Sequence, residues 1–301
     1  MFKKISILFT MFFACFICLT IHIYASEDKL FAVSISSSYT EKYIYYSDLP
    51  SSQTSFTSSY NPTENSSEIH NNETNNTDLI FGNDDRIILS DYQYTQYPYQ
   101  AVCSIYVEFE DSEDNPITYG YVGTGCLVGP HTVLSCSHLF YNNEYGWATY
   151  IEVQIGAHFD SITNAFTTSY TTSSWVNLMI GVQYITNSAD DDWAILDLSE
   201  NLGNQYGYFG LSSSLSVNDT VTLYAYHNDL NGNMAYGLGQ VTALNTYNFR
   251  HNCDAVAGSS GGPLTSGSNT IVGIHSRNYS STEDQACKIS SYIVSWIEER
   301  L

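Results

Sequence analysis

Short runs of apolar and β-branched residues recur along the chain from about residue 79 onward, and Gly, Asn, Asp or Ser separates each run from the next. Runs of this length between turn-forming residues are typical of an all-β sandwich or barrel, and the many Tyr and Thr residues suit strands. We therefore expect strands at 101–107, 125–128, 132–135, 150–155, 194–198, 221–226 and 270–274.

The last residues of the chain follow a different period. Apolar side chains recur there at helical spacing: Ile289, Tyr292, Ile293, Trp296 and Ile297. This spacing predicts a helix over about 288–300 that docks one face on the β fold.

The first residues have the composition of a secretory signal peptide. A basic head, Met1–Lys4, precedes an apolar run to about Ile23, and the residues that follow allow cleavage after Ala25. We predict a signal peptide over 1–25 and a secreted, extracellular protein. Because no other apolar run is long enough to span a bilayer, we expect no membrane association after its removal.

Composition changes again over residues 26–78, where Ser, Thr, Asn and Tyr dominate and clustered apolar residues are few. Such a segment has little to bury, so we expect it to be poorly ordered. It fits a propeptide, which would make the protein a zymogen with a mature domain at 79–301. An extracellular linker or stalk is the alternative.

The charge of the chain bears on its partners. The formal net charge is −22, with only nine Lys and Arg residues, so the phosphates of nucleic acid would be repelled. We expect protein or peptide partners, no nucleic acid, and a monomer.

The mature part contains five cysteines: Cys103, Cys126, Cys136, Cys253 and Cys287. Secretion permits disulfides, and an odd number leaves at least one thiol without an internal partner. We prefer a Cys253–Cys287 disulfide, which would brace both sides of a serine-containing loop, and a Cys103–Cys126 disulfide is a weaker prediction.

That loop is Gly258-Ser-Ser-Gly-Gly-Pro263, with Ser260 among small residues. Small residues allow a tight turn that exposes the hydroxyl and lets backbone N–H groups converge where an oxyanion can sit. A serine used in this way needs a histidine base and a carboxylate that orients the base. Taken alone, the loop is equally compatible with a Gly/Ser-rich surface turn.

Two upstream residues supply these groups. His138 follows the predicted strand 132–135, and Asp192 directly precedes the predicted strand 194–198, where a partly buried carboxylate needs a partner. Each alone also fits a surface histidine or an acidic turn, and Asp190 and Asp191 allow a weak cation site. The order His138, Asp192, Ser260 matches the chymotrypsin-type triad.

These segments carry a family resemblance. T-G-C-L-V-G-P-H-T-V-L-S-C-S-H, D-W-A-I-L-D-L and G-S-S-G-G-P resemble the triad segments of chymotrypsin-like serine proteases. Further segments resemble the secreted glutamyl endopeptidases of Gram-positive bacteria: Gly82–Arg86, Tyr97–Ala101, Gly203–Gly210 and Gly273–His275.

The resemblance covers about 79–301 and implies two antiparallel β-barrels of chymotrypsin type, at about 95–200 and 205–287, with the site in the cleft between them. It implies a serine endopeptidase in which the N–H groups of Gly258 and Ser260 form the oxyanion hole. We expect neither a cofactor nor a metal.

The specificity pocket leaves alternatives open. In glutamyl endopeptidases a histidine that matches His275 helps to bind the acidic side chain of the substrate, and a hydroxyl residue at the position of Ala255 assists. Ala255 departs from that pattern, and we expect Ser276 or another hydroxyl residue to take its place. Asp254 lies where trypsin-like enzymes carry the aspartate that binds Lys or Arg, although glutamyl endopeptidases often carry one too. We expect cleavage after Glu (or Asp), with Lys/Arg specificity as the alternative.

Two non-enzymatic hypotheses remain. One is a catalytically inactive relative that binds a surface or a partner through its cleft, and the other is an adhesive cell-surface protein with 26–78 as its stalk.

Overall fold

The computed structural model describes residues 29–50, 54–62, 80–110, 118–185, 191–267 and 269–301. The predicted signal peptide, 1–25, lies outside these residues. Among the helices of the described ranges, none combines the length and the apolar character that crossing a membrane requires.

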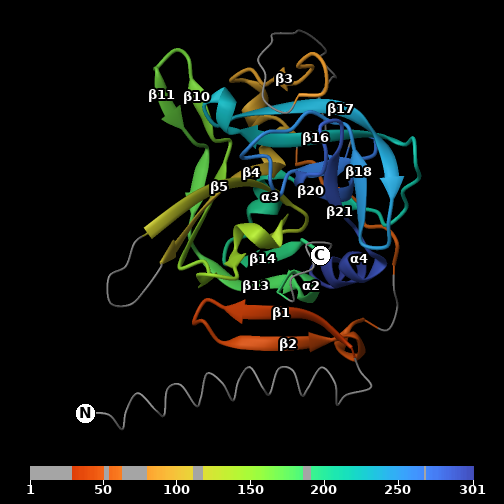
Figure 1. Ribbon diagram of the computed structural model, residues 1–301. Coiled ribbons are helices and arrows are strands. Elements are labelled where there is room, and N and C mark those ends of the chain that lie inside the picture. The colour runs from red at the N-terminus through yellow and green to blue at the C-terminus, as the bar shows by residue number, and fades with distance from the viewer. Residues whose placement is uncertain (1–28, 51–53, 63–79, 111–117, 186–190, 268) are drawn as a thin grey trace.

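The N-terminal half forms a nine-stranded antiparallel sheet (Figure 1). Along the sheet its strands are β12 (Tyr170–Thr172), β9 (Tyr150–Ile155), β4 (Val102–Glu110), β5 (Thr118–Leu127), β6 (Thr132–Ser135), β14 (Ala194–Leu198), β13 (Trp175–Gly181), β1 (Leu30–Ser36) and β2 (Glu41–Tyr45).

The C-terminal half closes into a barrel. The order along its sheet is β15 (Gly210–Leu211), β20 (Thr270–Asn278), β19 (Pro263–Thr265), β16 (Thr220–His227), β17 (Asn233–Leu244), β18 (Asn248–His251) and β21 (Asp284–Lys288), and β3 (Ile87–Ile88) pairs with β17. Because β20 also pairs with β21, the strands from β20 to β21 in this order form a closed barrel.

Shorter elements connect these strands. Two small hairpins are formed by β7 (Tyr141–Asn142) with β8 (Gly146–Trp147) and by β10 (His158–Asp160) with β11 (Ala165–Thr167). The short helices are α2 (Val182–Ile185), α3 (Leu202–Tyr206) and the 3-10 turns η1 (Tyr46–Asp48), η2 (Gln93–Thr95), η3 (Tyr99–Ala101), η4 (Ser137–Leu139) and η5 (Asn228–Leu230).

The predicted strands and the C-terminal helix are confirmed. Helix α4 runs over Ser291–Glu298, begins at Ser290, whose hydroxyl accepts the N–H of Ile293, and buries Ile293, Val294 and Ile297. A hydroxyl N-cap followed by an apolar stripe explains both the start of the helix and the face it docks.

The expectation of poor order for 26–78 is wrong for much of this segment. Strands β1 and β2 form a hairpin that extends the first sheet, because β1 pairs with the edge of β13 (orange-red in Figure 1). Phe31 of β1 is buried, with its ring centroid 5.3 Å from that of Trp193. Residues 51–53 and 63–79 lie outside the described ranges.

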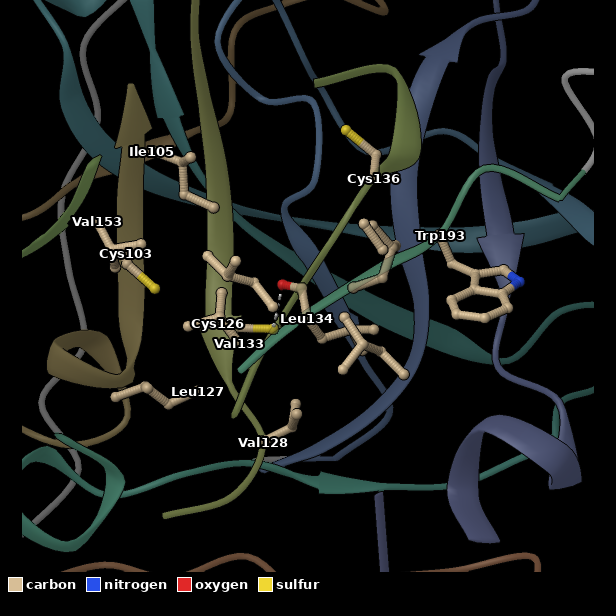
Figure 2. Close-up of a cluster of buried hydrophobic side chains, with 14 of the residues drawn as sticks. Cys103, Ile105, Cys126, Leu127, Val128, Val133, Leu134, Cys136, Val153 and Trp193 are labelled. Carbon is tan, nitrogen blue, oxygen red and sulfur yellow. Dashed lines mark hydrogen bonds between the residues drawn. The ribbon is translucent and has the colours of Figure 1, made fainter. Parts of the chain in front are cut away.

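The predicted disulfides are absent from the described chain, where all five cysteines are free and buried. Cys253 packs in the core of the C-terminal barrel, whereas Cys287 belongs to the other, larger apolar core. Cys103 pairs with Gly125 across β4 and β5, so it is one residue out of register with Cys126. Figure 2 shows the sulfurs of Cys103 and Cys126 within the core of the first sheet.

Candidate active site

Two adjacent strands bring His138 and Asp192 together. Strand β6 pairs with β14, with Ser135 opposite Ala194, so the residues just beyond β6 meet those just before β14. The His138 ring contacts the carboxylate through Nδ1 and Oδ2, 2.7 Å apart, and the His138 backbone N–H donates to Oδ1 at 3.0 Å. Ser137 secures the junction by donating to the carbonyl oxygen of Trp193.

The two side chains differ in exposure. Asp192 is buried, with 3% of its side chain exposed, whereas 32% of the His138 side chain is exposed. Burial alone would raise the pKa of Asp192, but the charge and hydrogen bonds of His138 outweigh burial and lower it. Burial likewise opposes protonation of His138, but Asp192 and Cys136 together outweigh burial and raise the pKa of His138 above its ordinary value. The pair therefore has an ionised carboxylate that orients the imidazole.

Ser276 has a different partner from the one that the sequence predicted. Its buried hydroxyl donates to Oδ2 of Asp192, the oxygen that His138 also contacts. Successive residues of a strand point to opposite faces, so on β20 Ser276 turns toward Asp192 while His275 turns toward β18. Ser276 thus supports the His138–Asp192 pair.

The serine loop is a set of tight turns that only glycine accommodates. Gly258 and Gly261 have φ values of +98° and +85°, and a Cβ atom on Gly261 would lie 2.0 Å from the carbonyl oxygen of Thr124. The N–H groups of Ser259 and Gly261 donate to Val256 and His275. Within the described ranges, those of Gly258 and Ser260 have no protein acceptor, as an oxyanion hole requires.

Thr124 of β5 clamps this loop to the first sheet. Its fully buried hydroxyl donates to the carbonyl oxygen of Gly258 and accepts the N–H of Tyr226, each at 2.9 Å. Its backbone N–H donates to the carbonyl oxygen of Ser260 at 2.7 Å. One residue of the first sheet therefore fixes both ends of the Gly258–Ser260 segment.

The buried His275 is linked to a second buried histidine, His251 of β18. The N–H of Cys253 donates to Nδ1 of His251, and Nε2 of His251 lies 3.2 Å from Nδ1 of His275. Burial lowers the pKa of His275 to about 3, with help from the charge of His138, and burial and His275 lower that of His251 well below its ordinary value. Both rings are therefore neutral near pH 7.

The hydrogen bonds fix the position of each proton on this pair. Because Nδ1 of His251 accepts a hydrogen bond, its proton is on Nε2, which donates to Nδ1 of His275. The proton of neutral His275 is then on Nε2, for which the described chain offers no acceptor. His275 thus presents one N–H donor.

Asp254 is buried and engaged by the chain itself. Oδ1 accepts the N–H of Phe81 at 2.7 Å, and Oδ2 accepts the N–H of Asp85 at 3.2 Å. Arg86 anchors the same segment through Asp229, at 2.6 Å. Asp254 therefore ties 81–86 to the barrel. The adjacent Ala255 is fully buried in the apolar core of that barrel.

A third group lies beside the His138–Asp192 pair. Cys136, fully buried at the start of η4, places Sγ 3.6 Å from Nε2 of His138. Ser260 Oγ makes no hydrogen bond within the described ranges. One group of described residues has donor atoms close enough together to hold a metal ion: Cys136, His138 and Asp192. Of the cation pair considered from the sequence, Asp191 accepts from the indole of Trp193, and Asp190 lies outside the described residues.

Sequence reasoning missed Thr124, His251 and Cys136. Thr124 and His251 act through contacts with residues more than twenty positions away, which no local motif signals. Cys136 stands two residues before His138, but the predicted disulfides leave it as the unpaired thiol and give it no role.

The chain is similar to known proteins in sequence and in fold. The family model described as "Trypsin-like peptidase domain" matches residues 123–274, which is half of the chain. A solved structure of a Glu endopeptidase in complex with MPD superposes with a TM-score of 0.58 and 22% identity, covering 73% of this chain and 98% of that one. This structure shows the fold and confirms the predicted fold class.

Two curated relatives come from Bacillus. The glutamyl endopeptidase of Bacillus licheniformis is 28% identical over 189 residues, which are 62% of this chain and 54% of that protein. The protein named "Extracellular metalloprotease" of Bacillus subtilis is 26% identical over 218 residues, covering 70% and 61%. The chain thus spans little more than half the length of these relatives, and the resemblance to glutamyl endopeptidases is confirmed. The match to the family model shows that the chain belongs to the trypsin-like peptidase domain family.

Proposed function

We propose that the chain is a secreted serine endopeptidase, made as a zymogen, that hydrolyses peptide bonds after Glu (or Asp) through His138, Asp192 and Ser260. The observation that carries the proposal is the bond of 2.7 Å between His138 Nδ1 and Asp192 Oδ2, on a fold that also presents Ser260 in a loop with two free N–H groups. This combination supplies a base, its orienting carboxylate and an oxyanion hole.

The mechanism follows from these groups. Ser260 attacks the peptide carbonyl, His138 takes the serine proton and returns it to the leaving amine, and Asp192 stabilises the imidazolium. The N–H groups of Gly258 and Ser260 donate hydrogen bonds to the oxyanion. Ser260 and His138 are not hydrogen-bonded in the free protein, and catalytic hydrogen bonds of this kind often tighten only when substrate binds.

Acidic specificity is supported by the histidine pair. The proton positions on His251 and His275 leave the Nε2–H of His275 as a donor for a carboxylate. Asp254 offers less to a Lys or Arg side chain, since each of its oxygens already accepts a backbone N–H. We therefore favour Glu (or Asp) over the Lys/Arg alternative.

A peptide library cleaved by the mature protein and analysed by mass spectrometry tests this specificity. We expect cuts after Glu or Asp, a loss of that preference in His275→Ala, and its retention in the matched pocket variant Asp254→Asn. Cuts after Lys or Arg that disappear in Asp254→Asn would overturn the acidic assignment and leave the serine mechanism intact.

The zymogen part of the proposal concerns 26–78. The hairpin of β1 and β2 occupies the edge of β13, and the residues from Phe81 onward are held by Asp254. We propose that processing near Leu79 releases the mature domain, that cleavage after Asp78 is autocatalytic, and that the mature protein acts as a monomer on protein or peptide substrates.

N-terminal sequencing of the active secreted protein tests the processing step. The expected terminus lies near Leu79, and active protein that begins near Ser26 would contradict the zymogen proposal. Pure Ser260→Ala precursor should stay unprocessed, whereas its spontaneous conversion would exclude autocatalysis.

A further inference from the structure

The thiol of Cys136 has no part in the mechanism above, although it lies beside the nitrogen of His138 that faces away from Asp192. Its sulfur lies 3.6 Å from Nε2, the atom that must accept the serine proton. Figure 2 shows Cys136 apart from Cys103 and Cys126.

The spacing of these two atoms suits a bound cation. Zinc binds a thiolate at about 2.3 Å and an imidazole nitrogen at about 2.0–2.1 Å, and a tetrahedral angle between these bonds separates sulfur and nitrogen by about 3.5 Å. The observed separation is 3.6 Å. The distance between the two donors is therefore the one that a single bound ion requires.

The surroundings of His138 are those of a metal ligand. Its Nδ1 faces Asp192 at 2.7 Å, and a ligating histidine commonly donates its other N–H to a carboxylate, which fixes the ring. Asp192 Oδ2 already accepts hydrogen bonds from His138 and Ser276. Asp192 therefore orients His138 and does not bind the ion. With 32% of its side chain exposed, His138 gives an ion a route from solvent.

We propose that Cys136 Sγ and His138 Nε2 form an inhibitory site for a thiophilic divalent cation, with Zn²⁺ as the preferred ion. The inhibition rests on the proposed function, because an ion on Nε2 occupies the lone pair that His138 needs as a base. The site offers two protein ligands where catalytic zinc sites offer three, so we expect the inhibitory ion to bind reversibly. Soft thiolate and imidazole donors select Zn²⁺ over Mg²⁺ and Ca²⁺.

Binding is tested apart from catalysis with Co²⁺ as a spectroscopic probe. Full-length Ser260→Ala protein is titrated with Co²⁺, and the thiolate-to-cobalt charge-transfer band in the near ultraviolet is followed. We expect a band that saturates at one ion per chain, disappears in Cys136→Ser and Cys136→Ala, and persists in the matched buried variant Cys126→Ser. No band, or a band that survives both Cys136 variants, would overturn the site.

Inhibition is then tested on the processed enzyme. Residual activity is measured against Zn²⁺ concentration, relative to the metal-free activity of each variant. Loss of a ligand should raise the half-inhibitory concentration in Cys136→Ala by about 10-fold or more, since even outer contacts of metal sites are worth that much. Equal concentrations for wild type and Cys136→Ala would overturn the regulatory role. If the protein has no peptidase activity, the Co²⁺ titration still decides the site.

Discussion

Thr124 gives the sharpest test of how the fold positions the proposed nucleophile. Thr124→Val replaces a buried hydroxyl by a methyl group of similar size at the contact between the first sheet and the serine loop. The carbonyl oxygen of Gly258 and the N–H of Tyr226 then both lose their partner.

The expected loss of stability follows from these two unpaired groups. A buried polar group left without a partner costs about 1–3 kcal/mol, so the variant should lose about 2–6 kcal/mol in its free energy of unfolding. The loop also carries both oxyanion donors. Loss of one such donor lowers turnover by about 10²–10³-fold, so we expect kcat to fall by about 10²-fold with little change in KM.

The assay is steady-state cleavage of a peptide with Glu before the scissile bond, with urea denaturation of the same samples. Thr124→Ser restores the hydroxyl and should recover most of kcat. Thr132→Val is the matched control, because it removes another fully buried hydroxyl, one that donates to Asp197 outside the loop. Wild-type kcat in Thr124→Val, or an equal loss of kcat in Thr132→Val, would refute the positioning role.

Two further predictions concern stability. Asp284 is fully buried, neither carboxylate oxygen has a partner in the described chain, and burial, with the charge of Asp254, raises its pKa to about 8. Since the unfolded chain releases this proton near pH 4, the native state loses about 1.4 kcal/mol per pH unit between pH 4 and 8 from this group. Urea denaturation should show Asp284→Asn gaining up to about 4 kcal/mol on wild type between pH 4 and pH 7, and a difference that does not change with pH would contradict this. Phe31→Ala should destabilise the unprocessed precursor, in a Ser260→Ala background, by about 3–5 kcal/mol, because the ring packs on Trp193 and is buried. An unchanged unfolding midpoint would show that the hairpin adds nothing to the fold.

The sequence predicted features that depend on local pattern. Strand runs such as 132–135 and 194–198 carry their own apolar signal, and the helix over Ser291–Glu298 carries a cap and a stripe. His138 and Asp192 were found because each stands at the end of such a strand, and pairing of β6 with β14 then brings them together.

What the sequence could not predict depends on distant partners. The hairpin of β1 and β2 is embedded in a polar segment, and its partner β13 begins at Trp175, far along the chain. The contact of Ser276 with Asp192 was also unpredictable, because the direction of a side chain depends on strand register. The disulfide predictions failed because spacing does not reveal that Cys253 and Cys287 pack in different cores.

Labelling with a serine-reactive phosphonate tests whether Ser260 is an activated nucleophile. The processed protein is treated with the reagent, digested, and analysed by mass spectrometry beside Ser260→Ala. We expect one adduct per chain, located on Ser260, and none in the variant. Absence of labelling in the processed protein, or labelling that survives Ser260→Ala, would contradict a His138–Asp192–Ser260 enzyme and favour a non-catalytic role for the cleft.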